Sequence, residues 1–205
     1  MTSIRAYIQH LFGKQNVITV VSGLPRSGTS MMMSALKAGG MDLIIDQVRT
    51  ADPNNPKGYF EFERVKKLPK GDTRWLKQAG GKAIKIISAL LQFLPDDYHY
   101  KVIFMERDLD EVLASQQRML ERSGKPLNSR DEEDQIRKSY LDHLEEVSAW
   151  LSKKDWIQTL FVSYNDILHV PEEEFPKIAS FLSGKVDPDA MISVVDPRLY
   201  REKGN

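Results

Sequence analysis

The chain has 205 residues, and its 29 lysines and arginines balance 29 aspartates and glutamates, so its formal net charge is zero. This length fits one domain, and a hydrophobic content of 41% is that of an ordinary globular protein. The charge balance argues against a general nucleic-acid or membrane-surface binder, and the lack of cysteine excludes disulfides, thiol nucleophiles and Cys-ligated metals.

The N-terminal stretch, MTSIRAYIQHLFGK, has apolar residues at helical spacing but no continuous apolar core like that of a secretory signal. We expect a short docked helix there and a cytoplasmic protein. The β-branched run VITVVS, residues 17–22, predicts a first strand. A glycine-rich turn over 23–28 follows, and then a helix over 29–37 that Gly39 and Gly40 end.

The next part of the chain is expected to alternate loops, strands and short helices. Residues 50–59 are loop by composition, and 60–68 are predicted to form one or two helical turns. A second strand is predicted at 82–87, followed by a short helix over 88–94, and a third strand at 101–106.

Capping boxes predict the starts of two further helices. Asp108 with Glu111 opens a helix that ends near Arg122, and a loop over 123–127 follows. Ser129 opens a long helix with one apolar face, made of Ile136, Tyr140, Leu144, Val147 and Leu151. The remaining elements are a fourth strand at 156–163, a helix over 172–182, and a short helix with a tail over 187–200.

Strands that are apolar on both faces and alternate with helices indicate a parallel sheet covered on both sides. We therefore predict a single α/β domain over residues 1–205, with three layers and a mostly parallel central sheet. Ligands of such sheets bind beyond the carboxyl ends of the strands. The residues that follow the strands, namely 23–30, 86–88, Arg107 and Tyr164, are therefore the candidates for function.

Residues 23–30, GLPRSGTS, nearly match the phosphate-binding pattern G-x-x-x-x-G-K-[ST], with a strand before and a helix after. Glycine permits a tight turn whose backbone N–H groups point at an anion, and the helix N-terminus adds positive charge. Thr29 stands where a nucleoside triphosphatase has its lysine, and Arg26 supplies a cation inside the loop. This disfavours a triphosphate–Mg²⁺ enzyme and favours a shorter anionic ligand.

The same loop resembles the 5′-phosphosulfate loop of the sulfotransferase family, a P-loop family that moves a sulfuryl group from 3′-phosphoadenosine 5′-phosphosulfate (PAPS) to a hydroxyl or amine. The resemblance spans nearly the whole chain and is closest to small bacterial members. It implies that the phosphosulfate is bound by Arg26, Ser27, Gly28, Thr29 and Ser30. Met31 stands where cytosolic members often have a tryptophan against the adenine.

The family's 3′-phosphate motif, an arginine at a strand end and a serine in the next helix, resembles Arg107 and Ser115. The resemblance implies that this pair binds the 3′-phosphate. From the residues alone, an ion pair of Arg107 with Asp110 or Glu111 is an alternative, with Ser115 bonded to a helix carbonyl.

Two other segments are similar to parts of the family. Tyr164, in FVSYNDIL, resembles a tyrosine that lies near the adenine, and the alternative is an ordinary strand-end cap. The C-terminal Arg201-Glu-Lys203-Gly weakly resembles a segment that closes on the 3′-phosphate, and the alternative is a solvated tail.

Sulfuryl transfer requires removal of the acceptor's proton and stabilisation of the leaving phosphate. Cytosolic members carry Lys-Thr-His at the end of the second strand, and here Lys85 is followed by Ile86 and Ile87. The tyrosylprotein branch uses a glutamate instead, and the segment GYFEFER resembles its motif. This resemblance implies Glu61 as the base, with Glu63 as the alternative, and Lys85 and Arg26 as catalytic cations.

The expected enzyme uses PAPS, releases adenosine 3′,5′-bisphosphate (PAP), needs no metal, and acts on a small-molecule or peptide acceptor, with no nucleic-acid or membrane partner. Two rivals remain open, a non-catalytic adenine-nucleotide-binding protein of the same fold and a P-loop phosphotransferase. The chain is shorter than many relatives, so the sequence is compatible with an open acceptor cleft or with one completed by a second subunit of a homo-oligomer.

Overall fold

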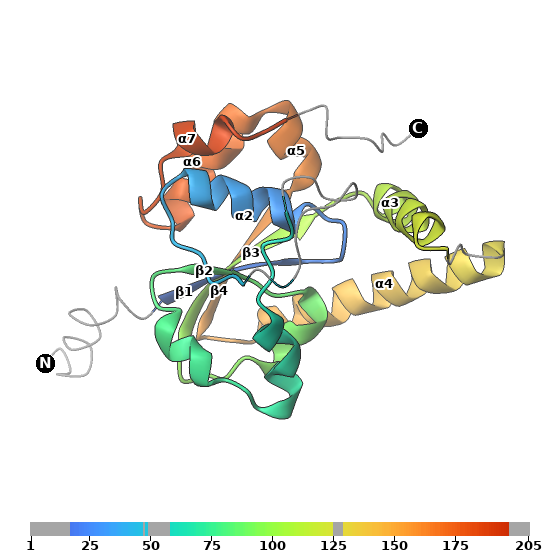
Figure 1. Cartoon of the computed structure of the whole chain (residues 1–205), viewed down its shortest axis with the longest axis horizontal. Coiled ribbons are helices and arrows are strands. Elements are labelled where there is room, and N and C mark those ends of the chain that lie inside the picture. Colours follow the sequence, from blue (N-terminus) through green and yellow to red (C-terminus); the bar gives the residue numbers. More distant parts are fainter. Residues whose placement is uncertain (1–16, 47, 49–57, 125–128, 197–205) are drawn as a thin grey trace, which may run out of the picture.

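The computed structural model of the chain describes residues 17–46, 48, 58–124 and 129–196. The predicted N-terminal helix, most of the 50–59 loop and the Arg201–Gly204 segment lie outside the described residues. The centre is a four-stranded sheet of order β2-β1-β3-β4, and all three strand pairings are parallel (Figure 1). Its strands are β1 (Val17–Gly23), β2 (Ala83–Lys85), β3 (His99–Glu106) and β4 (Ile157–Ser163).

Pairing explains where the strand bounds differ from the predicted ones. β3 begins at His99 rather than Lys101, because Val17 at the start of β1 pairs with His99. β2 has three residues instead of the predicted six, because it pairs with β1 over Thr19–Val21 only.

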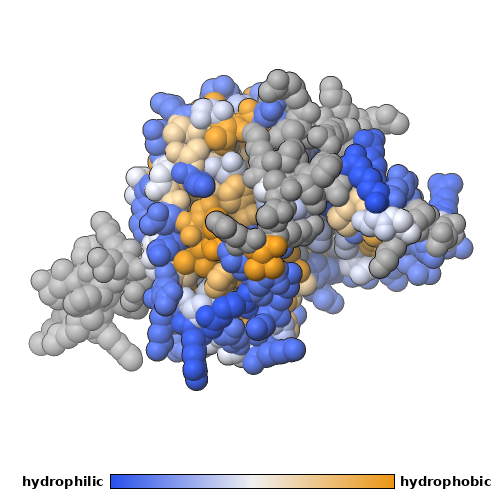
Figure 2. Space-filling model, in the orientation of Figure 1, coloured by the Kyte–Doolittle hydropathy of each residue, from blue (hydrophilic) through white to orange (hydrophobic). Residues whose placement is uncertain are grey.

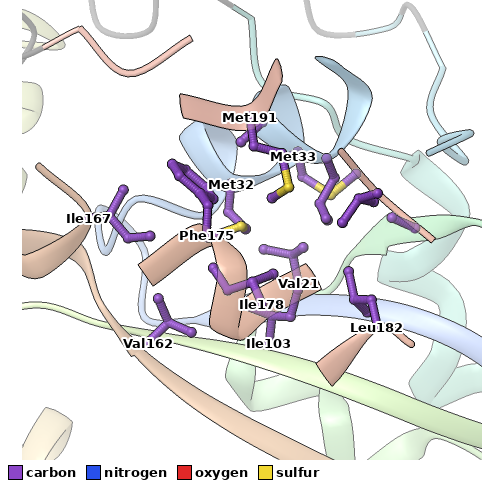
Figure 3. Packing of buried hydrophobic residues seen from close by; sticks show 14 of the residues in the cluster. Val21, Met32, Met33, Ile103, Val162, Ile167, Phe175, Ile178, Leu182 and Met191 are labelled. Atoms are coloured by element: carbon purple, nitrogen blue, oxygen red, sulfur yellow. The ribbon is translucent and has the colours of Figure 1, made fainter. Parts of the chain in front are cut away.

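Successive side chains of each strand point to opposite faces of the sheet, so two apolar cores form. On one face, Val21, Ile103 and Val162 lie under Met32, Met33, Phe175 and Ile178, as Figure 3 shows. Four helices cover this face, namely α2 (Thr29–Ala38), α5 (Tyr164–His169), α6 (Pro171–Phe181) and α7 (Pro188–Ile192).

The opposite face of the sheet carries Val20, Val102 and Phe104, and a second set of apolar side chains covers it, including Trp75 and Val147. These side chains come from three 3₁₀ helices and one long helix, η1 (Glu63–Lys70), η2 (Arg74–Gln78), η3 (Ser88–Phe93) and α4 (Arg130–Leu151). The predicted three-layer α/β architecture is thereby confirmed.

The helix α3 (Leu109–Arg122) and the N-terminal part of α4 extend beyond the sheet on one side of the molecule (Figure 1). On the predicted apolar face of α4, Val147 and Leu151 are buried, whereas Ile136, Tyr140 and Leu144 are only half-buried. Figure 2 shows the face of the molecule that is turned to the viewer in Figure 1. Apolar surface gathers there below α2, whereas the surface at the bottom of the view, over the 3₁₀ helices, is mostly hydrophilic. No helix in the described part of the chain is long and apolar enough to cross a bilayer.

Two elements were not predicted from the sequence, η2 and α5. The helix α5 starts directly after β4, where Ser163 Oγ accepts a hydrogen bond from Asp166 N at 3.1 Å. Its six residues are too few to show a helical period, which is why the sequence did not reveal this helix. Tyr164 is its first residue and does not form a strand-end cap.

The sheet order places the ligand edge between β1 and β3. From β1 the chain goes to β2 on one side of it and then to β3 on the other, which makes the carboxyl ends of β1 and β3 a topological switch point. Gly23 is paired with Met105 there, and a Cβ at Gly23 would lie 2.6 Å from the Met105 carbonyl oxygen. The residues after Gly23 and those after Met105 therefore emerge side by side.

Candidate active site

A cleft of about 610 Å³ opens at this edge of the sheet. Its lining comes from the 23–30 loop, hereafter the phosphate loop, and from the start of α2, segment 59–66, the end of β2, helix α3 and α5. The lining includes every predicted site residue except Ser27, namely Arg26, Gly28, Thr29, Ser30, Glu61, Lys85, Arg107, Ser115 and Tyr164.

The phosphate loop presents the N-terminus of α2 to this cleft. Gly28 is the N-cap with a φ of 96°, no described side chain caps the helix, and its first turn has no acidic residue. The first N–H groups of a helix have no partner within the helix, and they bind anions when no side chain caps them. The start of α2 therefore has the backbone geometry of an anion site.

Arg26 has a φ of 72°, in the left-handed region that non-glycine residues rarely adopt. Two contacts hold it there, because its Nε donates to Ser115 Oγ at 2.9 Å and its carbonyl oxygen accepts from Arg107 Nη1 at 3.0 Å. Arg26 and Ser115 are 89 residues apart in the sequence, so two distant predicted phosphate motifs are in direct contact.

Ser27 lies differently from its neighbours in the loop. Its side chain is buried, its Oγ donates to Leu24 O at 2.8 Å, and its backbone N–H donates to the same oxygen at 3.2 Å. Both donors therefore shape the loop, and a contact of Ser27 with the phosphosulfate stays a prediction.

Tyr164 packs directly against the phosphate loop. A Cβ at Gly28 would lie 2.3 Å from the Tyr164 ring, so only glycine fits at that position. The Arg107 guanidinium lies 4.7 Å from the centroid of the same ring. Burial raises the pKa of the Tyr164 phenol although Arg107 and Arg26 act in the opposite direction, so the phenol is neutral at physiological pH.

Arg107 forms a buried ion pair with Glu111, with a distance of 2.8 Å between Nε and Oε2. Asn165 Nδ2 donates to the other carboxylate oxygen of Glu111 at 3.0 Å. Asp108 is the N-cap of α3, as predicted, and accepts from Asp110 N and Glu111 N, while the Glu111 side chain binds Arg107. The ion pair left open by the sequence is present, and it lies within the wall of the cleft.

Lys85 and Glu61 meet on the opposite wall, with 3.7 Å between Nζ and Oε1. Lys85 Nζ also donates to Tyr59 O and, at 3.3 Å, to Ser30 Oγ, which ties β2 to segment 59–66 and to the start of α2. Only 8% of the Lys85 side chain and 21% of the Glu61 side chain are exposed. A carboxylate, an ammonium group and a helix N-terminus thus converge at one place.

The structure separates the two glutamates proposed as base. Glu61 lines the cleft, whereas Glu63 lies outside its lining and pairs at 2.6 Å with Lys66, which does line it. The position that carries histidine in cytosolic relatives is Ile87, which lines the cleft. His143 lies elsewhere, with Nε2 2.8 Å from Ser88 Oγ, and no histidine of the described residues lines the cleft.

Some cleft residues were not singled out from the sequence. Met119 and Arg122 follow Ser115 on the same face of α3, and Phe62 and Val65 face the cleft from segment 59–66. The spacing of Ser115, Met119 and Arg122, four and then three residues apart, was a usable signal once Ser115 had been placed at the site.

A parallel sheet with an uncapped glycine loop at its switch point defines a P-loop-type α/β domain. The model of the sulfotransferase domain matches residues 18–202, so the chain belongs to the sulfotransferase family. It is thus an enzyme of sulfuryl transfer. The described residues contain no group of three or more His, Cys, Asp or Glu side chains placed to hold a metal ion.

Solved structures of two sulfotransferase domains share this fold. The sulfotransferase domain from the Synechococcus PCC 7002 olefin synthase is similar with a TM-score of 0.53 and 15% identity, over 94% of this chain and 82% of that one. The sulfotransferase domain from the curacin biosynthetic pathway gives a TM-score of 0.50 and 12% identity, over 88% of this chain and 89% of that one. No curated protein matches the chain.

Proposed function

We propose that this enzyme is cytoplasmic and transfers the sulfuryl group of PAPS to a hydroxyl or amine of a small-molecule or peptide acceptor, with PAP as the second product. The observation that carries the proposal is the meeting, in one cleft, of the phosphate loop, the Arg107 and Ser115 side chains and the Glu61–Lys85 pair.

The residues of the cleft fit the chemistry of this donor. The N-terminus of α2 and the Arg26 guanidinium suit the 5′-phosphosulfate, and Arg107 with Ser115 suits the 3′-phosphate. Tyr164 and Met31 offer apolar surface to the adenine. Thr29, in the position of the lysine of nucleoside triphosphatases, leaves the site without their usual contact to β- and γ-phosphates. When bound, PAPS supplies an activated sulfuryl group.

The protein side chains provide the acid–base and electrostatic parts of the reaction. Glu61 accepts the proton of the acceptor group through a carboxylate oxygen at the cleft surface. Lys85 and Arg26 place positive charge beside the phosphate loop, where the bridging oxygen of the leaving phosphate becomes negative. The bond of Lys85 to Tyr59 O keeps Glu61, two residues further on, next to this charge.

Ligand-dependent thermal unfolding tests the donor. PAP is expected to raise the unfolding temperature more than ATP–Mg²⁺ at equal concentration, because a ligand bound only to the native state at 100 times its Kd stabilises it by about 2.7 kcal/mol. Equal stabilisation by ATP–Mg²⁺ that a chelator abolishes would support the phosphotransferase rival instead. PAP binding without transfer of labelled sulfuryl to any of a panel of alcohols, phenols and amines would support the non-catalytic rival.

A further inference from the structure

The cleft is strongly basic although the chain as a whole has no net charge. Its carboxylates among the described lining residues are Glu61 and Asp196. Its cations are Arg26, Lys66, Lys85, Arg107, Arg118 and Arg122. The lining therefore carries more cationic than anionic side chains, which favours an anionic ligand.

The proposed donor accounts for only part of this excess. Arg26, Lys85 and Arg107 lie at the phosphate loop and at the ends of β2 and β3, where the two anionic groups of PAPS would bind. Lys66 is paired with Glu63 at 2.6 Å. The remaining cations are Arg118 and Arg122 of α3. Both also make contacts within the chain, so the excess lies in the net charge of the lining and does not require that either arginine is unpaired.

Helix α3 gives these arginines a definite place relative to the phosphate loop. Ser115 is bonded to Arg26, and Met119 and Arg122 follow on the same helix face. At a rise of about 1.5 Å per residue, Arg122 lies roughly 10 Å along the helix axis from Ser115. Arg118, Met119 and Arg122 thus continue the α3 wall of the cleft beyond Ser115, with an arginine before and after the methionine.

Other elements add apolar side chains to the lining of the cleft. Segment 59–66 contributes Phe62 and Val65, and the residues after β2 contribute Ile87 and Leu90. Apolar side chains favour an apolar ligand body, and an arginine fork binds a carboxylate or phosphate through two parallel hydrogen bonds. A neutral or cationic acceptor would contact the apolar side chains but would not bind the arginines.

We infer that the acceptor is an anionic amphipath, an apolar alcohol or phenol with a carboxylate or similar anion held by Arg118 and Arg122 of α3. This inference rests on the proposed function, because it places the reacting hydroxyl at the Glu61 end of the cleft. It names a substrate class and two residues that determine specificity.

Binding to the protein–PAP complex, measured by calorimetry, tests this inference without relying on turnover. The probes are hydroxyphenyl and straight-chain hydroxy carboxylates of graded length, each with its primary amide and its amine analogue. At the best length, the carboxylate is expected to bind at least tenfold more tightly than the amide and the amine.

Variants assign the preference to α3. Arg118→Gln and Arg122→Gln are each expected to weaken carboxylate binding severalfold and to leave amide binding unchanged, whereas Arg118→Glu/Arg122→Glu should favour the amine. Arg74→Gln, which removes an exposed arginine outside the cleft lining, is the matched control and should bind like the wild type. Thermal unfolding of each variant shows whether the fold is retained.

Two failures are distinguishable in this experiment. Tight PAP binding with no carboxylate of the series preferred over its amide, or with a preference that survives the Arg118→Gln/Arg122→Gln double substitution, overturns the inference alone. A failure of PAP to bind overturns the proposed donor.

Discussion

Arg107 illustrates how a single residue serves both the fold and the site. Its guanidinium binds the Glu111 carboxylate and the Arg26 carbonyl oxygen, and it lies over the Tyr164 ring. These contacts join the end of β3 to the phosphate loop, α3 and α5. From the residues alone, a phosphate ligand and an ion pair with Glu111 were alternatives for Arg107. The structure contains the ion pair, and the contact with a phosphate stays a prediction.

Replacing Arg107 should therefore affect stability as well as binding. Arg107→Ala leaves the buried Glu111 carboxylate without its cation, and loss of one partner of a buried pair costs about 3–5 kcal/mol. Adding Glu111→Gln should recover part of this loss in urea unfolding. Equal unfolding free energies for the single and double variants would show that the buried charge is not the cause.

The same substitution should discriminate between two nucleotides in the protein that remains folded. A charged hydrogen bond to phosphate contributes about 1.5–3 kcal/mol, so Arg107→Ala should weaken PAP binding about tenfold or more. Binding of adenosine 5′-phosphosulfate, which has no 3′-phosphate, should change little. Equal losses for the two ligands in calorimetry would assign Arg107 to another part of the nucleotide.

The two glutamates of segment 59–66 provide a matched pair for the base. Glu61→Gln keeps the size of the side chain and removes its basicity, so kcat should fall by about 10²–10⁴ with PAP binding nearly unchanged. Glu63→Gln changes a glutamate that is not in the cleft lining and that pairs with Lys66, and it should leave turnover near that of the wild type. The opposite pattern would move the role to Glu63, and full activity of both variants would show that no carboxylate of this segment is the base.

At the scale of elements, the unit formed by β1, the phosphate loop and α2 depends on close approach of α5. The Tyr164 ring occupies the space that a side chain at residue 28 would need. The glycine of the phosphate-loop pattern therefore serves packing as well as backbone geometry, and a helix from the C-terminal third of the chain enforces it.

Gly28→Ala and Gly40→Ala separate these two roles. Both glycines have positive φ values, 96° and 91°, so alanine at either position costs about 1–2 kcal/mol of backbone strain. A Cβ at Gly40 meets nothing within 4 Å, whereas one at Gly28 collides with Tyr164. Gly28→Ala should therefore lower the unfolding free energy by about 1–3 kcal/mol more than Gly40→Ala does. Equal losses in urea unfolding would mean that Tyr164 moves aside without cost.

The elements also show what a sequence can and cannot reveal. Runs such as VITVVS and KVIFME identify buried strands, and the glycine pattern identifies the turn between β1 and α2, because these signals are local. The side-chain partners are not local. That Glu111 binds Arg107, or that Arg26 binds Ser115, depends on how distant segments pack, and α5 is too short to have a period of its own.

At the scale of the whole molecule, the core between the sheet and the layer of α4 and the 3₁₀ helices includes a tyrosine whose ionisation is coupled to folding. Tyr100 is 1% exposed, its hydroxyl donates to Pro95 O at 3.2 Å, and its ring meets Trp156 edge-on. Burial raises the pKa of Tyr100 above its ordinary value of 10.0, with smaller contributions from nearby Tyr98, Asp97 and Asp96. The folded protein therefore keeps the proton at a pH at which the unfolded chain loses it.

This coupling predicts a loss of stability in alkaline solution. The contribution of Tyr100 is complete below pH 10, the ordinary pKa, and is lost as the pH rises toward the raised pKa of the folded state. The unfolding free energy of the wild type should thus fall more steeply above pH 10 than that of Tyr100→Phe, in which the group is absent. Urea unfolding at a series of pH values compares the two, and parallel curves would contradict the coupling.

The pairing of Arg107 with Glu111 also affects how the enzyme responds to its ionic surroundings. In the proposed donor complex, the 3′-phosphate would share the Arg107 guanidinium with Glu111, a counter-ion that the fold supplies, and would release few salt ions from it. Nucleotide affinity should then decline less with ionic strength than at a site whose cations face only water. Release of the proposed product PAP would be eased for the same reason, because Glu111 already compensates the charge that the nucleotide leaves behind.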